Sequence, residues 1–438
     1  TGIIANELSD EQLRELDASG AQIFPIELVV INLYPFREDM EEGVPFEEAA
    51  SHIDVGGSAL LNAAARNFMH TVAVCDPDDY DRVLCDLAAG VIAEDERKYL
   101  MYKAFAYTAS YDALVAQYLS YSLKIAFPKT LTVTYEKTQD MLYGENPHQR
   151  AAVYREPLLK EGSIARAKQL AGADLTYSNI HDANAALELI KEFDEPTVVV
   201  CKHFMPCAAG TGSDVYEAFE RAKRADPGRL RGGILSSNGS VDARVAAASR
   251  VTGGGVVLCS RVVPGAMSVP RVQKAIILLE MPDIRSKVQF STFDMKKIYG
   301  GLLVQTYDTA LADGAACVTA RKPSDTELLA LEFNYKVVKH AHSSAVVIGN
   351  TGETLGIGAG QSNRLLALRF AFERAGERAA EAVIASDSGL LTIETLEECK
   401  ENGITAVIQT GVPEKKVLRL CDKYGIAVVC TELRHFKA

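Results

Sequence analysis

The sequence predicts a multi-domain α/β protein, and three observations carry that prediction. The chain has 438 residues, which at roughly 150 residues per domain corresponds to two or three domains. Hydrophobic residues make up 48% of the chain, which is enough for well-formed cores. Short apolar, β-branched runs alternate with longer segments of helical periodicity, an order that is typical of α/β folds.

The first 120 residues are expected to form an α/β domain. The predicted elements are a helix at 11–16, strands at 27–33 and 71–75, and helices at 46–52, 59–67 and from 76 to about 119. The break at 53–58 holds Asp54, Gly56 and Gly57. An Asp followed by two glycines at a helix start offers N–H groups to an anion, although the same pattern is often only a turn.

Residues 121–140 change in character, and we expect a domain boundary there. The next stretch, Tyr143-Gly144-Glu145-Asn146-Pro147-His148-Gln149, predicts an irregular polar loop that is either a ligand shelf or a hydrogen-bonded junction. Further helices are expected at 182–193, up to 225, directly after Asp242 and at 327–340. Further strands are expected at 198–202, 232–239, 256–258, 300–305, 343–348, 383–385, 406–408 and 426–429.

The strand at 198–202 leads into the most reactive pair of side chains, Lys202 and His203. Ligands of open α/β sheets lie outside the carboxyl ends of the strands, and a Lys beside a His can exchange protons near neutral pH. The same pair can also be structural, as a solvated lysine and a hydrogen-bonded histidine. We expect the chain to turn at Pro206.

A glycine-rich strand at 355–360 precedes a helix that contains Arg364. Glycines at alternate positions leave one strand face without side chains, so either a flat ligand or another backbone can approach closely. Arg364 could reach a phosphate with two hydrogen bonds. The glycines at 253–255 lack the Lys-Ser/Thr of a phosphate-binding loop and are interpreted as a plain loop.

Composition excludes several classes of protein. The formal net charge of −12 argues against a general nucleic-acid or anionic-membrane binder. The nine cysteines form no CxxC pair and no zinc spacing, which predicts reduced thiols in a cytoplasm. No apolar run reaches the ~18 residues of a membrane span. The first residues resemble no signal peptide and lack an initiating Met, as expected of a chain that begins partway into a longer protein.

Five landmarks occur in a recognisable order: 32–36 (NLYPF), 53–57 (IDVGG), 143–149 (YGENPHQ), 202–203 (KH) and 356–361 (GIGAGQ). With them the chain resembles the bifunctional purine-biosynthesis family that joins AICAR transformylase to IMP cyclohydrolase. The resemblance covers nearly the whole chain. It implies a partial methylglyoxal-synthase-like domain at 1–125, which would close FAICAR to IMP. A transformylase of two cytidine-deaminase-like subdomains would follow at 135–438, divided near 310–330.

The resemblance also implies the reaction. The formyl group of 10-formyltetrahydrofolate would pass to the 5-amino group of AICAR, giving FAICAR. His203 would take the proton of the amine, and Lys202 would protonate the departing folate nitrogen or stabilise the oxyanion. Folate is expected as a co-substrate, no metal is expected, and a monovalent cation is compatible with the family. Family members are homodimers with shared active sites, and no nucleic-acid or membrane partner is expected.

The remaining site residues are assigned by matching family positions. The residues expected to bind AICAR are Tyr143, Gly144, Gly232, Asp242, Ser344, Gln361, Arg364 and Arg434. The residues expected to bind the folate are Arg231, Leu365, Gly389, Leu390 and Glu394. The cyclohydrolase remnant consists of Tyr34, Asp54, Gly56, Gly57 and Arg66.

Departures from the family leave alternatives open. Leu142 replaces a phosphate-binding Arg, Ser344 replaces an Asn, and 389–392 (GLLT) replaces part of the folate site. Arg66 and Phe68 replace the Lys and His of the cyclohydrolase, whose opening segment is also missing. We therefore expect a lost or impaired cyclohydrolase. The alternatives to an active transformylase are a silent homologue that binds a purine-pathway ribotide, and a formyltransferase with a different donor.

Overall fold

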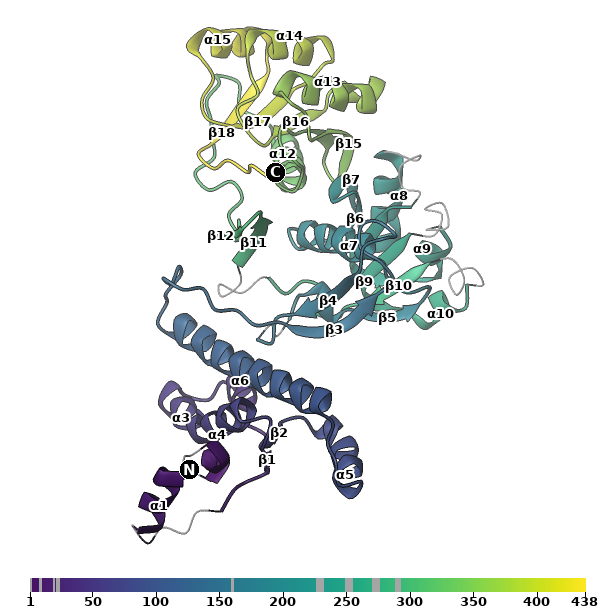
Figure 1. Ribbon diagram of the computed structural model, residues 1–438. Helices are drawn as coiled ribbons and strands as arrows, with labels where there is room; N and C mark the ends of the chain where they lie inside the picture. The colour runs from purple at the N-terminus through teal and green to yellow at the C-terminus, as the bar shows by residue number, and fades with distance from the viewer. Residues whose placement is uncertain are drawn as a thin grey trace. The chain divides into compact units, whose positions relative to one another are not determined.

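The computed structural model describes residues 2–7, 10–18, 20, 24–158, 161–225, 232–248, 255–269, 276–287 and 293–438. The chain forms two compact units, drawn in Figure 1: unit 1 contains 1–138 and 154–160, and unit 2 contains 139–153 and 161–438. The chain passes into unit 2 within β3 (Glu136–Met141) and returns within β4 (Ala151–Arg155). Arg231 and the glycines predicted to form a loop at 253–254 lie outside the described residues.

Unit 1 pairs two short parallel strands, β1 (Leu28–Val30) and β2 (Val72–Val74). Its helices are η1 (Gly2–Glu7), α1 (Asp10–Ala18), α2 (Phe36–Glu42), α3 (Phe46–Ser51), α4 (Val55–Arg66), η2 (Pro77–Asp79), α5 (Tyr80–Ala88) and α6 (Glu94–Ser122). The core lies between α4 and α6, where Leu61 and Ala104 are fully buried. Both predicted strands and the helix at 46–52 are confirmed, and α2 was not predicted.

The predicted break at 53–58 is wrong, because α4 already begins at Val55. The carboxylate of Asp54 accepts a hydrogen bond from the Gly57 amide at 2.7 Å, which satisfies an N–H at the helix start. A Cβ on Gly57 would lie 2.8 Å from the side chain of Leu33. The two glycines therefore lie in the first turn of the helix, and Gly57 lets it approach Leu33 after β1, whereas no atom lies within 4 Å of the Cβ position of Gly56.

Unit 2 is built on one sheet of twelve strands. Their order is β13-β18-β17-β16-β14-β15-β7-β6-β8-β9-β10-β5. The strands are β5 (Lys168–Ala171), β6 (Thr197–Lys202), β7 (Met205–Thr211), β8 (Ile234–Val241), β9 (Val256–Val262), β10 (Ile277–Glu280), β13 (Ala316–Cys317), β14 (Val346–Asn350), β15 (Glu353–Gly358), β16 (Val383–Ser386), β17 (Ala406–Thr410) and β18 (Ala427–Thr431). A separate hairpin joins β11 (Phe293–Ile298) to β12 (Gly301–Thr306).

The helices of unit 2 alternate with these strands. Within the described residues they are η3 (Ile164–Arg166), α7 (Tyr177–Ile190), α8 (Val215–Ala225), α9 (Ala243–Ala248), α10 (Pro264–Met267), α12 (Asp325–Lys339), α13 (Arg364–Ala375), η5 (Gly376–Ala379), α14 (Ile393–Glu401) and α15 (Lys415–Tyr424). The helix predicted at 182–193 begins earlier, at Tyr177, because Thr176 and Asn179 form a capping box upstream. Asp242 caps α9 as predicted, accepting the amides of Arg244 and Val245.

The two halves of unit 2 repeat one another. The first half runs β5, α7, β6, β7, α8, β8, α9, β9, α10 and β10, and the second runs β13, α12, β14, β15, α13, β16, α14, β17, α15 and β18. Strand pairing is also the same in both halves: a hairpin, an antiparallel pairing of the hairpin with the next strand, two successive parallel pairings and an antiparallel edge strand. The halves join where β7 and β15 pair antiparallel. Unit 2 is therefore an internal structural duplication.

The helices cover both faces of this sheet (Figure 1). On one face, α7 and α12 share a single core that draws residues such as Leu187 and Leu331 from both halves. On the other face, α8 and α9 cover the first half, and α13, α14 and α15 cover the second. Because β7 and β15 run antiparallel, the turn between β6 and β7 lies at the end of the sheet where the chain leaves β15.

Alternate glycines in β15 serve helix packing. A Cβ on Gly356 would lie 2.1 Å from the carbonyl oxygen of Ala371, and a Cβ on Gly358 would lie 2.0 Å from that of Ala367. Both oxygens belong to the backbone of α13. Of the two alternatives that the sequence left open for this bare strand face, the structure favours the approach of another backbone.

We expect Gly358→Ala to lower the free energy of unfolding by about 2–3 kcal/mol, because the new methyl group must push α13 off the sheet. Urea unfolding followed by circular dichroism measures this change. Gly265→Ala is the matched control, since no atom lies within 4 Å of its Cβ position and its backbone is not left-handed. Equal stability of the two variants would contradict the packing explanation.

Candidate functional site

The predicted pair Lys202 and His203 lies at a tight two-residue hairpin turn. β6 ends at Lys202 and β7 begins at Met205, so His203 and Phe204 form the turn, with φ angles of 53° and 62°. The turn expected at Pro206 is wrong, because Pro206 is a buried residue inside β7. Left-handed φ angles are uncommon outside glycine and must be held by their surroundings.

Asp182 on α7 holds this turn. Its two carboxylate oxygens accept the backbone N–H groups of His203 at 3.0 Å and of Phe204 at 2.6 Å. Hydrogen bonds to an ionised acceptor are stronger than neutral ones, so one carboxylate fixes both left-handed residues. The side chain of His203 remains exposed next to Lys202.

Charged and aromatic side chains pack around the ring of Phe204. The imidazole of His181 stacks on its ring with centroids 3.9 Å apart, and His342 meets it edge-on at 5.8 Å. The ammonium of Lys437 lies 5.0 Å from the ring centre and forms an ion pair with Glu188 at 3.0 Å. Burial, helped by Lys437, lowers the pKa of His342. The surroundings therefore favour a neutral His342.

The exit of β15 reaches the same end of the sheet. The Gly360 amide donates to the carbonyl of His342 at 2.7 Å, and the Ser344 amide donates to that of Gln361 at 3.1 Å. The sulfur of Met205 lies 3.8 Å from the Cβ position of Gly360. The structure thus brings Ser344 and Gln361 close to the hairpin turn.

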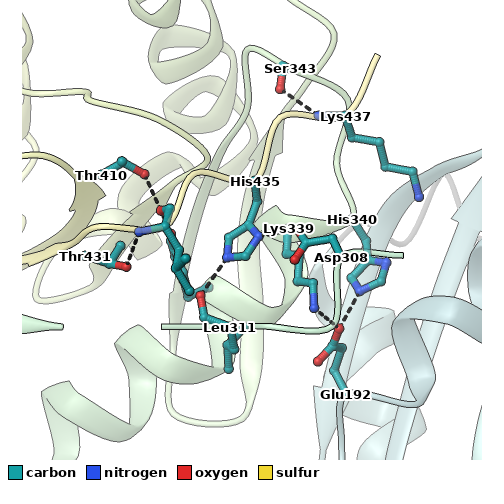
Figure 2. A network of polar contacts seen from close by, with 12 residues as sticks. Glu192, Asp308, Leu311, Lys339, His340, Ser343, Thr410, Thr431, His435 and Lys437 are labelled. Carbon is teal, nitrogen blue, oxygen red and sulfur yellow. Dashed lines mark hydrogen bonds and ion pairs between the residues drawn. The ribbon is translucent and has the colours of Figure 1, made fainter. Parts of the chain in front are cut away.

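The C-terminal tail is fastened to this region (Figure 2). Ser343 and Lys437 exchange two hydrogen bonds, of 2.8 Å from the Ser343 amide and 3.2 Å to its hydroxyl. His435 is 2% exposed and bonds through its two ring nitrogens to the carboxylate of Asp308 at 2.5 Å and the carbonyl of Leu311 at 2.6 Å. These anchors present Arg434, whose guanidinium lies 5.4 Å from the ring of Phe436, at the surface.

Of the residues expected around the folate, Leu365 lies at the start of α13, Gly389 and Leu390 lie in the loop after β16, and Glu394 lies in the first turn of α14. The exposed guanidinium of Arg364 donates to the carbonyl of Gly389. Leu390 is fully buried and hydrogen-bonds through its amide to Gln409, so its side chain supports the loop from inside. Leu365 is half-buried and Glu394 is exposed.

The structure does not bring every candidate to the hairpin turn. Gly232 precedes β8 near Cys201, but Asp242 follows the far end of that strand. At about 3.3 Å per residue, this places Asp242 about 25 Å from the Lys202 end of the sheet. Tyr143 and Gly144 belong to a separate closed turn, in which the Gly144 amide donates to Gln149 at 2.8 Å.

In unit 1, four of the five cyclohydrolase candidates lie close together and Arg66 does not. The Tyr34 amide donates to the carboxylate of Asp54 at 3.3 Å, and Gly56 and Gly57 follow in the first turn of α4. Arg66 ends the same helix, about 16 Å away at 1.5 Å per residue. Arg66 therefore lies at the opposite end of α4 from the contact between Tyr34 and Asp54.

Sequence reasoning missed the residues that support the turn, namely Asp182, His181, Phe204, His342 and Lys437. Asp182 lies 21 residues before His203 and was assigned only to a helix start. A contact between distant segments leaves no local pattern of spacing. His181 and Phe204 could have been noticed as aromatic groups beside polar ones, but their stacking depends on the fold.

We expect Asp182→Ala to lower the free energy of unfolding by about 2 kcal/mol, because two backbone N–H groups lose a charged acceptor. Asp182→Asn keeps one acceptor oxygen and should lose about half as much. Urea unfolding gives both values, and amide exchange at His203 and Phe204 reports the turn directly. Unchanged exchange in Asp182→Ala would contradict the role of this carboxylate.

Within the part of the chain that the structure describes, no helix is both long and apolar enough to cross a membrane. One solved structure, "Crystal structure of ForH", shares 38% identity but covers 26% of this chain and 60% of that chain, with a TM-score of 0.22. That overlap is too small to carry an argument about the fold.

Curated relatives match over the full length of the chain. A "Bifunctional purine biosynthesis protein PurH" from Acetivibrio thermocellus is 42% identical over 443 residues. Proteins of the same name from Ruminiclostridium cellulolyticum and Listeria monocytogenes are 40% and 41% identical. Each alignment covers 100% of this chain and 86% of the relative. The family described as AICARFT/IMPCHase bienzyme matches residues 64–374. The chain belongs to the AICARFT/IMPCHase bienzyme family.

Proposed function

We propose that this chain is an AICAR formyltransferase of purine biosynthesis and that unit 2 carries the reaction. The formyl group of 10-formyltetrahydrofolate passes to the 5-amino group of AICAR, giving FAICAR and tetrahydrofolate. Similarity to the curated bifunctional proteins over the whole chain supports the activity. The single structural observation that supports the location is the convergence of Lys202, His203, Ser344 and Gln361 at one end of the central sheet.

The chemistry fits an exposed His beside a Lys. The amine of AICAR is conjugated to a ring that carries a carboxamide, so it is a poor nucleophile and must lose a proton as the new C–N bond forms. His203 takes this proton, and Lys202 protonates the folate nitrogen as it leaves or stabilises the oxyanion. Acid–base groups of this kind contribute about 10²–10⁴-fold to a rate.

Arginines on two elements are proposed to bind the ribotide phosphate. Arg364 begins α13 and Arg434 lies on the tail fastened at Ser343, and both are exposed. Their guanidinium groups suit a phosphate because each offers a planar pair of donors. The folate is proposed to lie along 389–394, and no metal takes part in the reaction.

We further propose a cytoplasmic homodimer with shared active sites. The position of Asp242 supports sharing, since one chain separates it from Lys202 by about 25 Å along the sheet. If both residues contact one AICAR molecule, two copies of the chain must supply them.

Unit 1 is proposed to be the cyclohydrolase domain, with a slow ring closure. Tyr34 and Asp54 retain family positions and lie together. Arg66 and Phe68 stand where the family has Lys and His, and the bulkier, always charged Arg cannot exchange a proton as Lys can. FAICAR should therefore be released faster than it is closed to IMP.

The test is formyl transfer by the purified chain. AICAR and 10-formyltetrahydrofolate are mixed with protein, tetrahydrofolate release is followed by absorbance, and FAICAR is separated from IMP by chromatography. FAICAR in excess over IMP is the expected result. A folded protein that binds AICAR but transfers nothing would instead be a silent homologue, and transfer from another formyl donor alone would redefine the co-substrate.

A further inference from the structure

A hydrogen-bonded set of three acid–base side chains lies at the end of β1 in unit 1. Asp39, on α2, is only 6% exposed. The hydroxyl of Tyr34 donates to its Oδ1 at 3.2 Å, and Nδ1 of His52 lies 2.8 Å from its Oδ2. The two rings also touch, with centroids 4.9 Å apart. The three side chains come from the β1 exit, α2 and the end of α3, so the fold assembles them.

The hydrogen bonds define which ring nitrogen can react. A carboxylate only accepts, so the proton of a neutral His52 resides on Nδ1 and faces Asp39. The other nitrogen, Nε2, then holds the lone pair, and the side chain remains 31% exposed. A carboxylate behind an imidazole orients the ring and stabilises the charged form that appears when the ring takes a proton.

The backbone around the set is also fixed. Asp54 accepts the amide of Tyr34, and two phenols on α6 accept further amides at this site. Tyr107 binds the amide of Leu33 at 3.0 Å, and Tyr111 binds the amide of Asp54 at 2.9 Å. The rings of Tyr34 and His52 are in contact, so a ligand that touches Tyr34 at this site lies close to the imidazole.

We propose that His52 is a further catalytic residue of ring closure in unit 1, with Asp39 as its positioning residue. The inference rests on the proposed cyclohydrolase function of this unit. It assigns to the imidazole a proton transfer that neither Arg66 nor Phe68 supplies at this site.

The proton balance of the step is complete with one imidazole. The carboxamide nitrogen of FAICAR attacks the formyl carbon, and Nε2 of His52 takes a proton from that nitrogen as the C–N bond forms. The resulting imidazolium, stabilised by Asp39, returns the proton to the former formyl oxygen, which becomes the hydroxyl of a carbinolamine. In a second passage Nε2 takes the proton that remains on a nitrogen bonded to this carbon and delivers it to the hydroxyl, which leaves as water while the C=N bond of the ring forms. No oxidant, reductant or metal is needed, and the imidazole ends the cycle neutral.

The experiment supplies FAICAR directly to the full chain and measures IMP above the rate without protein. His52→Ala should lower kcat about 10²-fold with little change in KM, and added imidazole should restore part of the rate. Asp39→Asn should also lower kcat, without rescue by imidazole. His52→Gln retains a polar side chain and shows whether a lost rate comes only from loss of folding. His70→Ala replaces an exposed histidine and serves as the control.

Formyl transfer measured on the same preparations separates this inference from the proposed function. Retained transfer with an IMP rate that falls in His52→Ala and recovers with imidazole supports the assignment. Three results would overturn it: no IMP above background from the unaltered chain, an unchanged rate in His52→Ala, or a loss without rescue. A chain without formyl transfer that still closes FAICAR through His52 would contradict only the proposed transformylase.

Discussion

Replacement of His203 by asparagine is expected to lower kcat for formyl transfer by about 10²–10⁴-fold and to leave the melting temperature nearly unchanged. Asparagine tolerates the left-handed φ of 53° at this position but cannot exchange a proton near neutral pH. The backbone N–H that binds Asp182 is retained in the variant. Because the imidazole is exposed, its loss should leave the stability nearly unchanged and should slow the chemical step.

Steady-state kinetics with AICAR and 10-formyltetrahydrofolate give kcat and KM for this variant. His70→Asn, an exposed histidine of unit 1, is the matched control and should retain full transfer. A structural histidine would behave differently from a catalytic one: His203→Asn would then melt earlier and still transfer formyl at the normal kcat. That outcome would favour the structural alternative for the Lys202–His203 pair.

Some strands of unit 2 could be predicted because their signal is local: they are short apolar runs, and burial on both faces of the sheet requires such runs. Four strands of the central sheet, β5, β7, β10 and β13, were not predicted. β6 was predicted at 198–202 and is Thr197–Lys202, and α12 was predicted at 327–340 and is Asp325–Lys339. The start of α7 was missed because the capping box at Thr176 lies outside the apolar pattern that marked the helix.

The hairpin after β6 shows a second limit of prediction from sequence. Turn signals in sequence are dominated by glycine and proline, and Pro206 suggested a turn there. The actual turn uses two non-glycine residues in left-handed conformation, whose amides the carboxylate of Asp182 accepts. The reactive pair itself could be found because it follows a strand directly. Its support could not, because α7, the 342–344 loop and the C-terminal tail meet only in the folded chain.

Replacement of Glu192 by alanine is expected to lower the free energy of unfolding by about 3–5 kcal/mol. Glu192 accepts from the ammonium of Lys339 at 2.8 Å and from the imidazole of His340 at 2.9 Å, as Figure 2 shows. The side chain of Lys339 is only 4% exposed, so removing its partner leaves a buried cation without compensation. These contacts also join the end of α7 to the end of α12, that is, one half of unit 2 to the other.

Glu332→Ala is the matched control, and Glu332 lies on α12, the helix that carries Lys339. Its ion pair with Lys336 has the same length, 2.8 Å, but Glu332 is 55% exposed, and such a pair is worth about 0.3–0.5 kcal/mol. Urea unfolding of the two variants compares a buried pair with an exposed one at equal distance. Similar losses in both would mean that water reaches Lys339 and that the buried network contributes little.

The pH dependence gives an independent measure of the same network. Burial alone would raise the pKa of Glu192, but the hydrogen bonds and charges of His340 and Lys339 lower it to about 2, compared with the ordinary value of 4.5 for a glutamate. A carboxyl with a depressed folded pKa contributes its stability fully above the unfolded value and loses it as the pH falls towards the folded one. The unaltered chain should therefore lose about 3 kcal/mol through this residue between pH about 4.5 and pH about 2. Glu192→Gln has no carboxyl to protonate, so its stability should fall less steeply over this interval. Parallel curves for the two proteins would place the acid sensitivity of the fold elsewhere.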